Sequence, residues 1–556
     1  MTTLNYRLLL LALGALFFLP FLGAAPLFDW DEVNFAESAR EMLVTGDYSR
    51  VRVNFQPFWE KPPLFIWMQA VSMDMFGVNE YAARFPNAVF GILNLLLLFE
   101  LGRHLRSDRF GFLWAMCMFG AFLPHVYFKS GIIDPVFNTF IFLSVWCIYK
   151  AARQYGKPQA RSMSIVAGLF MGLAVLTKGP VGILLPVITT AAFWVFSRMK
   201  PLVSLINLFF CALTALLVSA IWFGPETLRN GTWFLEEFIR YQIRLFSTPD
   251  AGHAQPFYYH FVVVLLGCFP ISVPALRVLF RPAEARLEDP DFSLWMKCLL
   301  WTVLLLFSIV TTKIVHYSSM AYLPLAALAA ISLEEFLRGR QSWPFWKSLG
   351  FLLVGLIPGL AMLALPYIGR NPELIIPLIN DPFAVANLTA PVDWPLWYYA
   401  PGVLWLTGVL LTWWYFWQQR RVQALTAMFA LFSLAIGLFL ATFPAKIAGY
   451  TQNTALEYYR SLKAQNVYIE TLHFKSFAQY FYGAKRGFSQ AEAAHCKDAE
   501  GNYHIDVLRK WYLEGEIDKP VYFVVKSIHL DEYIYLPQLE LVQNKHGFAL
   551  LRRLPK

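Results

Sequence analysis

The side chains best placed to do chemistry in this 556-residue sequence stand in two short polar stretches near its N-terminus. Asp31 lies in Phe28-Asp-Trp-Asp-Glu32, directly before a segment whose apolar residues recur every three or four positions, as in an amphipathic helix. Glu60 and Lys61 precede two prolines, which restrict the backbone and so the directions of both side chains. Simpler interpretations stay open, because Asp29 or Asp31 could only cap the helix and Glu60-Lys61 could be an exposed ion pair.

Other polar residues stand at the ends of apolar segments or in the loops between them. They are Arg84, Asp134, Lys178, Arg244, His253, Lys313, His316 and Tyr317. Each has an ordinary explanation, since an Asp can cap a helix, a Lys can reach the membrane interface and a Tyr can join an aromatic belt. Taken together, however, they project onto the same membrane face as Asp31 and Glu60. Arg and Lys bind phosphate, so the set predicts a cavity for a substrate with a lipid tail and a phosphate head.

The composition is that of a membrane protein. Hydrophobic residues make up 57% of the chain and charged residues only 15%, against about 25% in soluble domains. This composition excludes a water-soluble enzyme, a disordered protein and a nucleic-acid-binding module. Of the six cysteines only Cys496 lies outside an apolar segment, so no disulfide framework is expected.

Thirteen mainly apolar segments are long enough to be membrane-spanning helices. They are approximately 8–27, 86–102, 110–128, 132–149, 163–177, 180–197, 202–223, 258–276, 296–311, 318–333, 347–367, 397–417 and 423–442. With the N-terminus inside, the inner connections carry eighteen Lys and Arg residues, whereas four of the outer connections carry one each. Because basic residues accumulate in cytoplasmic loops, the N-terminus is predicted inside and the C-terminus outside. Most of the net charge of +9 is therefore a topology signal.

Three polar regions are predicted on the outer side. Residues 28–85 and 224–257 form long loops, and the first begins with the amphipathic helix, expected to lie on the outer membrane surface. Residues 443–556 form a soluble tail with strand-like runs at 466–470 and 521–525 and a helix-like stretch at 507–513. The sequence thus predicts an all-α polytopic membrane domain, 1–442, and a C-terminal periplasmic α/β domain, 443–556.

At these residues the chain resembles the polyprenyl-phosphate-dependent glycosyltransferases of the GT-C fold, a family that includes protein O-mannosyltransferases. The matching motifs are Asp31-Glu32 with Arg40, Glu60-Lys61-Pro62-Pro63, Arg84-Phe-Pro86 and Asp134. Four further stretches are similar to the subgroup that transfers 4-amino-4-deoxy-L-arabinose to lipid A: Thr45-Gly46-Asp47, Lys178-Gly179-Pro180, Gly252–Pro256 and Lys313–Pro324. The resemblance covers nearly the whole chain, most strongly its first 330 residues, whereas the tail carries no recognised motif.

The resemblance implies thirteen spans, interfacial helices and a periplasmic domain in the bacterial inner membrane. It also implies the partners, an undecaprenyl-phosphate-linked aminosugar donor and a lipid A acceptor, and an outcome, resistance to polymyxin and cationic peptides. Membrane lipids are expected as further partners, nucleic acid is not, and a monomer is expected.

The expected roles follow from the reaction. The acceptor phosphate is largely ionised at neutral pH, since its second pKa is about 6, so the main need is to stabilise the leaving lipid phosphate. Lys61 is assigned that task, assisted by Arg244 or Lys178. Glu60, Asp31 or Asp134 could pair with the protonated amine of the sugar. Asp31 is expected to orient the acceptor or the aminosugar, and it acts as a base only toward a protonated acceptor. The catalytic residues are thus expected to be Asp31, Lys61 and Asp134, and the other candidates are expected to bind substrate.

Metal-independent catalysis is favoured, although Glu60 with His253 or His316 could hold a divalent cation. Two rival functions stay open. One is a GT-C transferase that moves another sugar, such as mannose, to protein or glycolipid. The other is a lipid transporter or flippase, which would usually place its polar residues near the bilayer midplane on repeated, broken helices.

Overall fold

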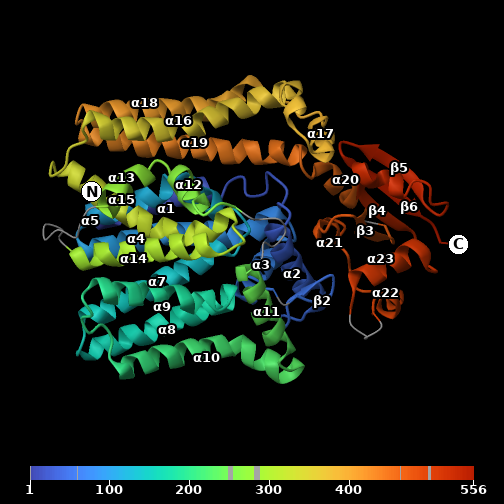
Figure 1. Ribbon diagram of the computed structural model, residues 1–556, viewed down its shortest axis with the longest axis horizontal. Helices are drawn as coiled ribbons and strands as arrows, with labels where there is room; N and C mark the ends of the chain where they lie inside the picture. The colour runs from blue at the N-terminus through green and yellow to red at the C-terminus, as the bar shows by residue number, and fades with distance from the viewer. Residues whose placement is uncertain are drawn as a thin grey trace.

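The structure, a computed structural model, describes residues 2–58, 60–247, 255–280, 289–463, 465–498 and 503–555. It consists of a large body of roughly parallel helices and a smaller C-terminal domain built on a sheet, with the two chain ends at opposite ends of the molecule (Figure 1). All six cysteines are buried and free. The expected combination of a helical membrane domain and a C-terminal α/β domain is therefore observed.

Every one of the thirteen apolar segments is largely helical. The helices are α1 (Thr3–Phe18), α4 (Glu80–Leu105), α5 (Asp108–Phe119) with α6 (Phe122–Phe128), α7 (Asp134–Arg153), α8 (Pro158–Lys178), α9 (Val181–Phe196), α10 (Leu205–Asn230), α12 (Tyr259–Gly267) with α13 (Ser272–Leu279), α14 (Pro290–Ile309), η2 (Val315–Ala321) with α15 (Tyr322–Leu337), α16 (Phe345–Arg370), α18 (Ala400–Trp417) and α19 (Arg421–Gly449). By length and composition eight helices of the described chain can cross a membrane, or nine if α5 and α6, bent by 77°, count as one span. The count of thirteen spans stays a prediction.

Close helix packing depends on small residues, as is usual between membrane helices. A Cβ atom on Gly102 of α4 would lie 2.6 Å from the Cα atom of Gly111 of α5, and one on Gly168 of α8 would meet the carbonyl of Cys211 of α10. Around these contacts α7, α8, α9 and α10 form one side of the body, whereas α16, α18 and α19 lie together on the opposite side (Figure 1).

The two long loops contain helices of their own. The first holds α2 (Asp31–Thr45), a small hairpin of β1 (Arg52–Val53) and β2 (Gln56–Pro57), and α3 (Leu64–Phe76); the second holds α11 (Trp233–Ser247). Helix α2 is predicted correctly, but not its place on the membrane surface, because α3 and the C-terminal domain cover it and its residues from Glu32 to Met42 are all buried. Within it Glu37 and Arg40 form a buried ion pair of 2.6 Å, so each of these two charges has a partner inside the protein.

The C-terminal domain follows a stretch of short helical turns and helices: η3 (Pro372–Leu374), η4 (Ile376–Leu378), α17 (Pro382–Leu388) and η5 (Leu396–Tyr399) precede α18, and α20 (Asn453–Leu462) follows α19. Its strands are β3 (Tyr468–Leu472), β4 (Val521–Lys526), β5 (Glu540–Lys545) and β6 (Phe548–Arg553), in the order β3-β4-β6-β5. Strands β3 and β4 are parallel, and the other pairs are antiparallel. Helices α21 (Ala478–Tyr482), α22 (Gln490–His495), α23 (Ile505–Glu514) and η6 (Ser527–Glu532) complete the domain. Both predicted strands and the helix near 507–513 are thus confirmed.

Candidate functional site

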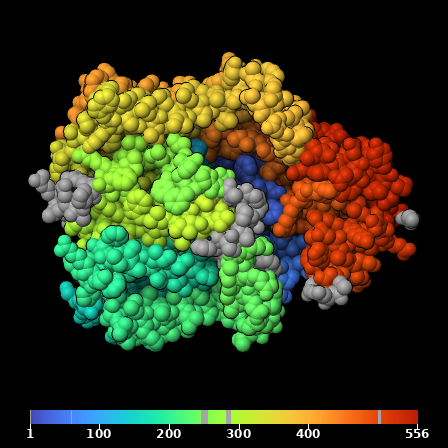
Figure 2. Space-filling model, in the orientation of Figure 1, coloured from blue at the N-terminus to red at the C-terminus, as the bar shows by residue number. Residues whose placement is uncertain are grey.

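A cavity of about 1020 Å³ lies where the helical body meets the C-terminal domain. In Figure 2 the N-terminal residues, in blue, are recessed between the two parts of the molecule. Nine of the eleven predicted site residues line the cavity: Asp31, Glu60, Lys61, Arg84, Asp134, Lys178, Arg244, His316 and Tyr317. Lys313 does not line it and is only 7% exposed, and His253 lies outside the described residues. Segments that are distant in sequence therefore bring most of the candidates together.

Much of the cavity lining is apolar. Side chains from the membrane helices α7, α9, α14 and α19 contribute Phe137, Leu185, Phe307 and Leu440 to it. Charged residues from loops and helix ends also line the cavity. The arrangement is amphipathic and suits a lipid whose head carries charge.

Asp134 and Lys178 form an ion pair in this lining. Lys178 is the last residue of α8 and Asp134 the first of α7, and Lys178 Nζ lies 2.7 Å from Asp134 Oδ1. The alternative that Asp134 caps α7 is not observed, because the cap position is Ile133 and no side chain accepts a hydrogen bond there. Lys178 also lies 5.4 Å from the ring centroid of Tyr317. The pair places one cation at the cavity with its counter-ion already in place.

Asp31 and His316 are neighbours in the cavity lining. It is the first residue of α2, and the cap position belongs to Trp30, which makes no side-chain cap. Asp31 Oδ2 lies 3.6 Å from His316 Nε2 on η2. Because Asp31 lines the cavity and does not cap its helix, it is available to orient a substrate.

Lys61 and Arg244 flank one aromatic ring. The Lys61 ammonium and the Arg244 guanidinium each lie 5.2 Å from the ring centroid of Tyr241 on α11. Burial lowers the pKa of Lys61, although Glu60 and Asp31 act in the opposite direction. A partly desolvated ammonium beside a guanidinium is an effective site for a phosphate group, since both interact more strongly with an anion away from bulk water.

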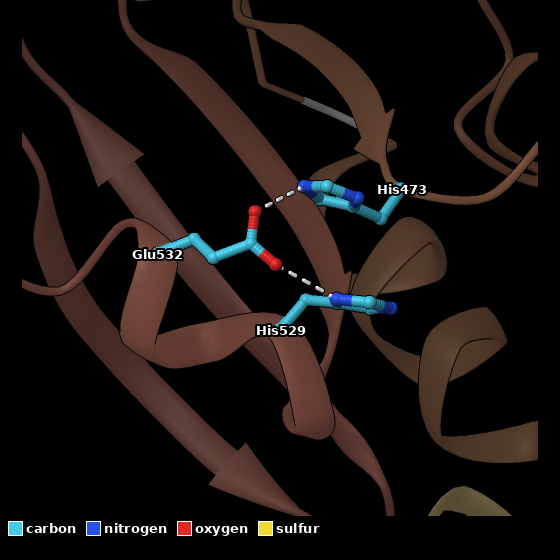
Figure 3. A group of neighbouring side chains, drawn as sticks. All are labelled: His473, His529 and Glu532. Atoms are coloured by element: carbon cyan, nitrogen blue, oxygen red, sulfur yellow. Dashed lines mark hydrogen bonds and ion pairs between the residues drawn. The ribbon is translucent and has the colours of Figure 1, made fainter.

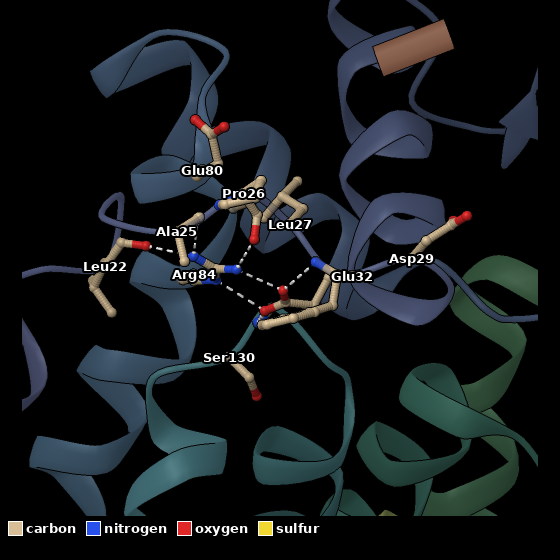
Figure 4. A network of polar contacts seen from close by, with 12 residues as sticks. Leu22, Ala25, Pro26, Leu27, Asp29, Glu32, Glu80, Arg84 and Ser130 are labelled. Carbon is tan, nitrogen blue, oxygen red and sulfur yellow. Dashed lines mark hydrogen bonds and ion pairs between the residues drawn. The ribbon is translucent and has the colours of Figure 1, made fainter. Parts of the chain in front are cut away.

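Arg84 has a structural role in addition to its place in the lining. Its guanidinium donates to both carboxylate oxygens of Glu32 and to the carbonyl oxygens of Leu22, Ala25 and Pro26 (Figure 4). All five N–H groups therefore have protein partners, which leaves no donor free for the substrate contact expected from the sequence. The guanidinium holds the turn between α1 and α2 against α4.

Glu32 is the buried counterpart of Arg84. Burial alone would raise the pKa of Glu32, but the Arg84 guanidinium and the backbone N–H groups of Phe28 and Gly131 together hold it below its ordinary value. In the sequence, Glu32 stands in the Asp31-Glu32 motif, which predicts no partner for it. Glu32 and Arg84 are fifty-two residues apart, so the sequence alone does not indicate that they form a pair.

Two further charged residues of the lining were not predicted. Lys129, which follows α6, donates to the carbonyl oxygens of Phe17, Phe18 and Pro20 and so satisfies acceptors at the C-terminal end of α1. Asp29 faces the cavity, where surrounding protein raises its pKa to about 6, while the Ser476 hydroxyl and the Phe477 backbone act in the opposite direction. The Lys129 contacts hold the end of α1, and the Asp29 contacts join the start of the first loop to the C-terminal domain.

The C-terminal domain contributes directly to the cavity through Lys475. Its ammonium lies 4.7 Å from the ring centroid of Trp30, and that ring stacks on Phe477 at 5.7 Å. Tyr482 Oη accepts a hydrogen bond from the backbone N–H of Leu27 at 2.8 Å. The domain is therefore part of the cavity wall, and no motif of the tail indicates this.

Residues 60–223 match the family described as dolichyl-phosphate-mannose-protein mannosyltransferase. The undecaprenyl phosphate-alpha-4-amino-4-deoxy-L-arabinose arabinosyl transferase of Pseudomonas aeruginosa is 30% identical over 370 residues, which cover 66% of this chain and 65% of the relative. The transferase of the same name from Erwinia tasmaniensis is 28% identical over 330 residues, or 59% of either chain. The chain thus spans about three-fifths to two-thirds of the length of these curated relatives.

Among solved structures, the chain is similar to the crystal structure of ArnT from Cupriavidus metallidurans bound to undecaprenyl phosphate. The TM-score is 0.75 at 18% identity, and the match covers 99% of this chain and 98% of that one. This likeness establishes the fold. The chain is a multi-pass membrane protein with the fold of a lipid-phosphate-dependent glycosyltransferase.

Within that class its sequence similarity is to undecaprenyl phosphate-aminoarabinose arabinosyl transferases. The resemblance inferred from the motifs is thereby confirmed.

Proposed function

We propose that this protein transfers 4-amino-4-deoxy-L-arabinose from undecaprenyl phosphate to a phosphate of lipid A and so confers resistance to polymyxin and cationic peptides. The observation that carries the proposal is the cavity itself, which is lined both by apolar side chains of the membrane helices and by Lys61, Lys178 and Arg244. The named relatives supply the sugar and its carrier. We place the cavity and the C-terminal domain on the periplasmic face of the bacterial inner membrane, on the basis of the loop charges.

The leaving group is the lipid phosphate, which gains negative charge as its bond to the sugar breaks. Lys61 and Arg244, each 5.2 Å from the centroid of the Tyr241 ring, are assigned to stabilise that charge. Fixed cations in a site of low polarity stabilise a transition state more than mobile cations in water do. The apolar side chains of the lining would hold the first isoprene units of the carrier.

The acceptor phosphate needs little help from a base, because it is already largely ionised at neutral pH. Asp31 is assigned to orient the acceptor or the protonated amine of the sugar, and it acts as a base only toward a protonated acceptor. Its contact with His316 limits the positions it can adopt. Asp134 is paired with Lys178, so its assigned part is to position that lysine beside the substrate.

We propose that catalysis does not require a metal, since the cations that line the cavity can provide the same stabilisation of charge. A divalent cation near Glu60 would need a second ligand, and His316 already faces Asp31. Membrane lipids are the expected surroundings, a monomer is the expected state, and nucleic acid is not an expected partner.

A test is mass spectrometry of lipid A from cells with and without the gene. An aminopentose on lipid A that disappears with the gene supports the proposal. Unchanged lipid A with altered protein glycosylation would favour a transferase that moves another sugar to protein. If lipid A and protein glycosylation were both unchanged, a lipid flippase would be favoured. In the same cells Asp31→Asn should lower transfer, and full transfer by this variant would remove Asp31 from the site.

A further inference from the structure

The C-terminal domain holds a group of metal-type ligands that the transfer reaction does not use. His473 directly follows β3, whereas His529 and Glu532 lie on η6, directly after β4. Strands β3 and β4 are parallel, with Leu472 opposite Val525, so their carboxyl ends meet at one edge of the sheet. The topology therefore brings together three side chains from two separate segments.

The Glu532 carboxylate contacts both imidazole rings, one through each oxygen (Figure 3). His473 Nε2 lies 2.9 Å from Glu532 Oε2, and His529 Nδ1 lies 2.9 Å from Glu532 Oε1. The two imidazole rings stack with centroids 4.4 Å apart and planes 12° apart. One ligand atom from each residue lies within 4.8 Å of the others, and within the described parts of the chain no other such group of three His, Cys, Asp or Glu residues occurs.

We propose that His473, His529 and Glu532 bind a divalent transition metal, with Zn²⁺ as the best match. Two imidazole nitrogens and one carboxylate oxygen are a known ligand set for Zn²⁺, with bonds of about 2.0–2.2 Å and a fourth position for water or another ligand. Ca²⁺ and Mg²⁺ prefer oxygen ligands and larger sets of them, so they fit this group less well.

Little movement is needed to form such a site. Each imidazole would give up its hydrogen bond to Glu532, lose the proton from that nitrogen to solvent and carry a proton on the other ring nitrogen, as neutral imidazole ligands do. His473 is held in the left-handed region with φ 63°, so the chain turns sharply after β3 where the ligand is needed. Since all three side chains are partly exposed, at 34%, 33% and 52%, an ion can reach them from solvent.

A bound ion would also affect the cavity wall. The segment that follows His473 contains Lys475, which lines the cavity, and Ser476 and Phe477, which contact Asp29 and Trp30. Joining His473 to η6 would fix one end of this segment to the sheet. The site is thus assigned a positioning role, separate from the bond-breaking step.

The test measures Zn²⁺ binding to the full chain in detergent, after removal of the affinity tag and treatment with a chelator. We expect one Zn²⁺ per chain by equilibrium dialysis, and with Co²⁺ the visible absorption of a four- or five-coordinate site. His529→Ala and Glu532→Gln should each weaken binding by about 10- to 100-fold or more. His504→Ala is the matched control, because His504 is an exposed histidine of the same domain that faces one carboxylate, Asp506, at 3.9 Å.

Folding is followed in the same samples. Zn²⁺ should raise the unfolding temperature of the wild type and of His504→Ala but not of His529→Ala, since only a folded site binds the ion. Without metal all three should unfold at similar temperatures. No stoichiometric Zn²⁺ binding by the wild type, or equal binding by His529→Ala, would overturn the proposal, whatever the transfer activity.

Discussion

Lys178 Nζ lies 2.7 Å from Asp134 Oδ1, and this ion pair joins the end of α8 to the start of α7 at the cavity. Each charge also suits its helix end, because a carboxylate is favoured at an N-terminus and an ammonium at a C-terminus. The Asp134 side chain is 4% exposed and that of Lys178 18%, so the cation is the more accessible of the two partners. The ion pair thus holds a cation in a fixed position at the cavity.

Lys178→Met should lower stability, because it leaves a buried carboxylate without its partner, a change that typically costs about 3–5 kcal/mol. Adding Asp134→Asn should restore most of the lost stability but not transfer, since the cation stays absent. Thermal unfolding in detergent and a transfer assay measure the two effects separately. If Lys178→Met unfolded at the wild-type temperature, the pair would not stabilise the fold.

Arg84→Lys should reduce stability and yield strongly, because a lysine cannot reproduce the five hydrogen bonds that the guanidinium makes. Arg103→Lys is the matched control, since Arg103 also pairs with a glutamate, Glu100, on the same helix but is about 29% exposed. An exposed pair contributes little, so the control should behave as wild type. Equal effects of the two substitutions would contradict the structural role given to Arg84.

The pKa of Asp29, raised to about 6, predicts a pH effect on stability. Between the ordinary pKa of 3.8 and about 6 the folded chain holds more protons at this site than the unfolded chain, so its contribution to stability falls as pH rises. Asp29→Asn does not titrate, and its unfolding temperature relative to wild type should therefore rise over this window and level off above it. Glu516→Gln, which alters an exposed carboxylate outside the cavity, serves as the control. A difference for Asp29→Asn that does not change with pH would contradict the shifted pKa.

Lys475→Ala should raise KM for one substrate by several-fold to about tenfold with a smaller change in kcat, because Lys475 lines the cavity beside Trp30 and is assigned no part in bond breaking. Lys519→Ala is the control: Lys519 also lies over an aromatic ring, that of Tyr468, at 4.0 Å, but it does not line the cavity. Steady-state kinetics in detergent distinguish the two variants. Identical KM values for wild type and Lys475→Ala would show that the domain only covers the cavity.

The sequence was sufficient to predict the helices, because apolar segments separated by charged loops report directly on burial in lipid. It was also sufficient to bring together most of the site, since residues at the outer ends of spans must share one membrane face. It could not predict which side chains of the site form ion pairs and hydrogen bonds with one another. Whether Asp134 caps a helix or pairs with Lys178 depends on how α7 and α8 pack. Three of the five donors of Arg84 are occupied by carbonyl oxygens of a turn with no recognisable motif.

The position of α2 was mispredicted for a related reason. Its apolar spacing is that of a surface helix, but α3 and the C-terminal domain cover its polar face. Charged residues of α2 such as Glu37 and Arg40 form a buried ion pair with each other. The spacing of residues along the helix predicts that both side chains are exposed. For the same reason, the part played by Lys475 in the cavity becomes visible only once the tail has folded against the first loop.

The central claim is that cations of this cavity stabilise the phosphate that leaves the aminosugar. The most direct measurement is the kcat of the purified chain with undecaprenyl-phosphate aminoarabinose and lipid A, for the wild type, Lys61→Ala and Lys61→Arg, with unfolding temperatures recorded for all three. The wild type should add an aminopentose to lipid A, and Lys61→Ala should lower kcat by about 10²–10³-fold at an unchanged unfolding temperature, with Lys61→Arg in between. Lack of transfer by the folded wild type, or an unchanged kcat for Lys61→Ala, would contradict the claim.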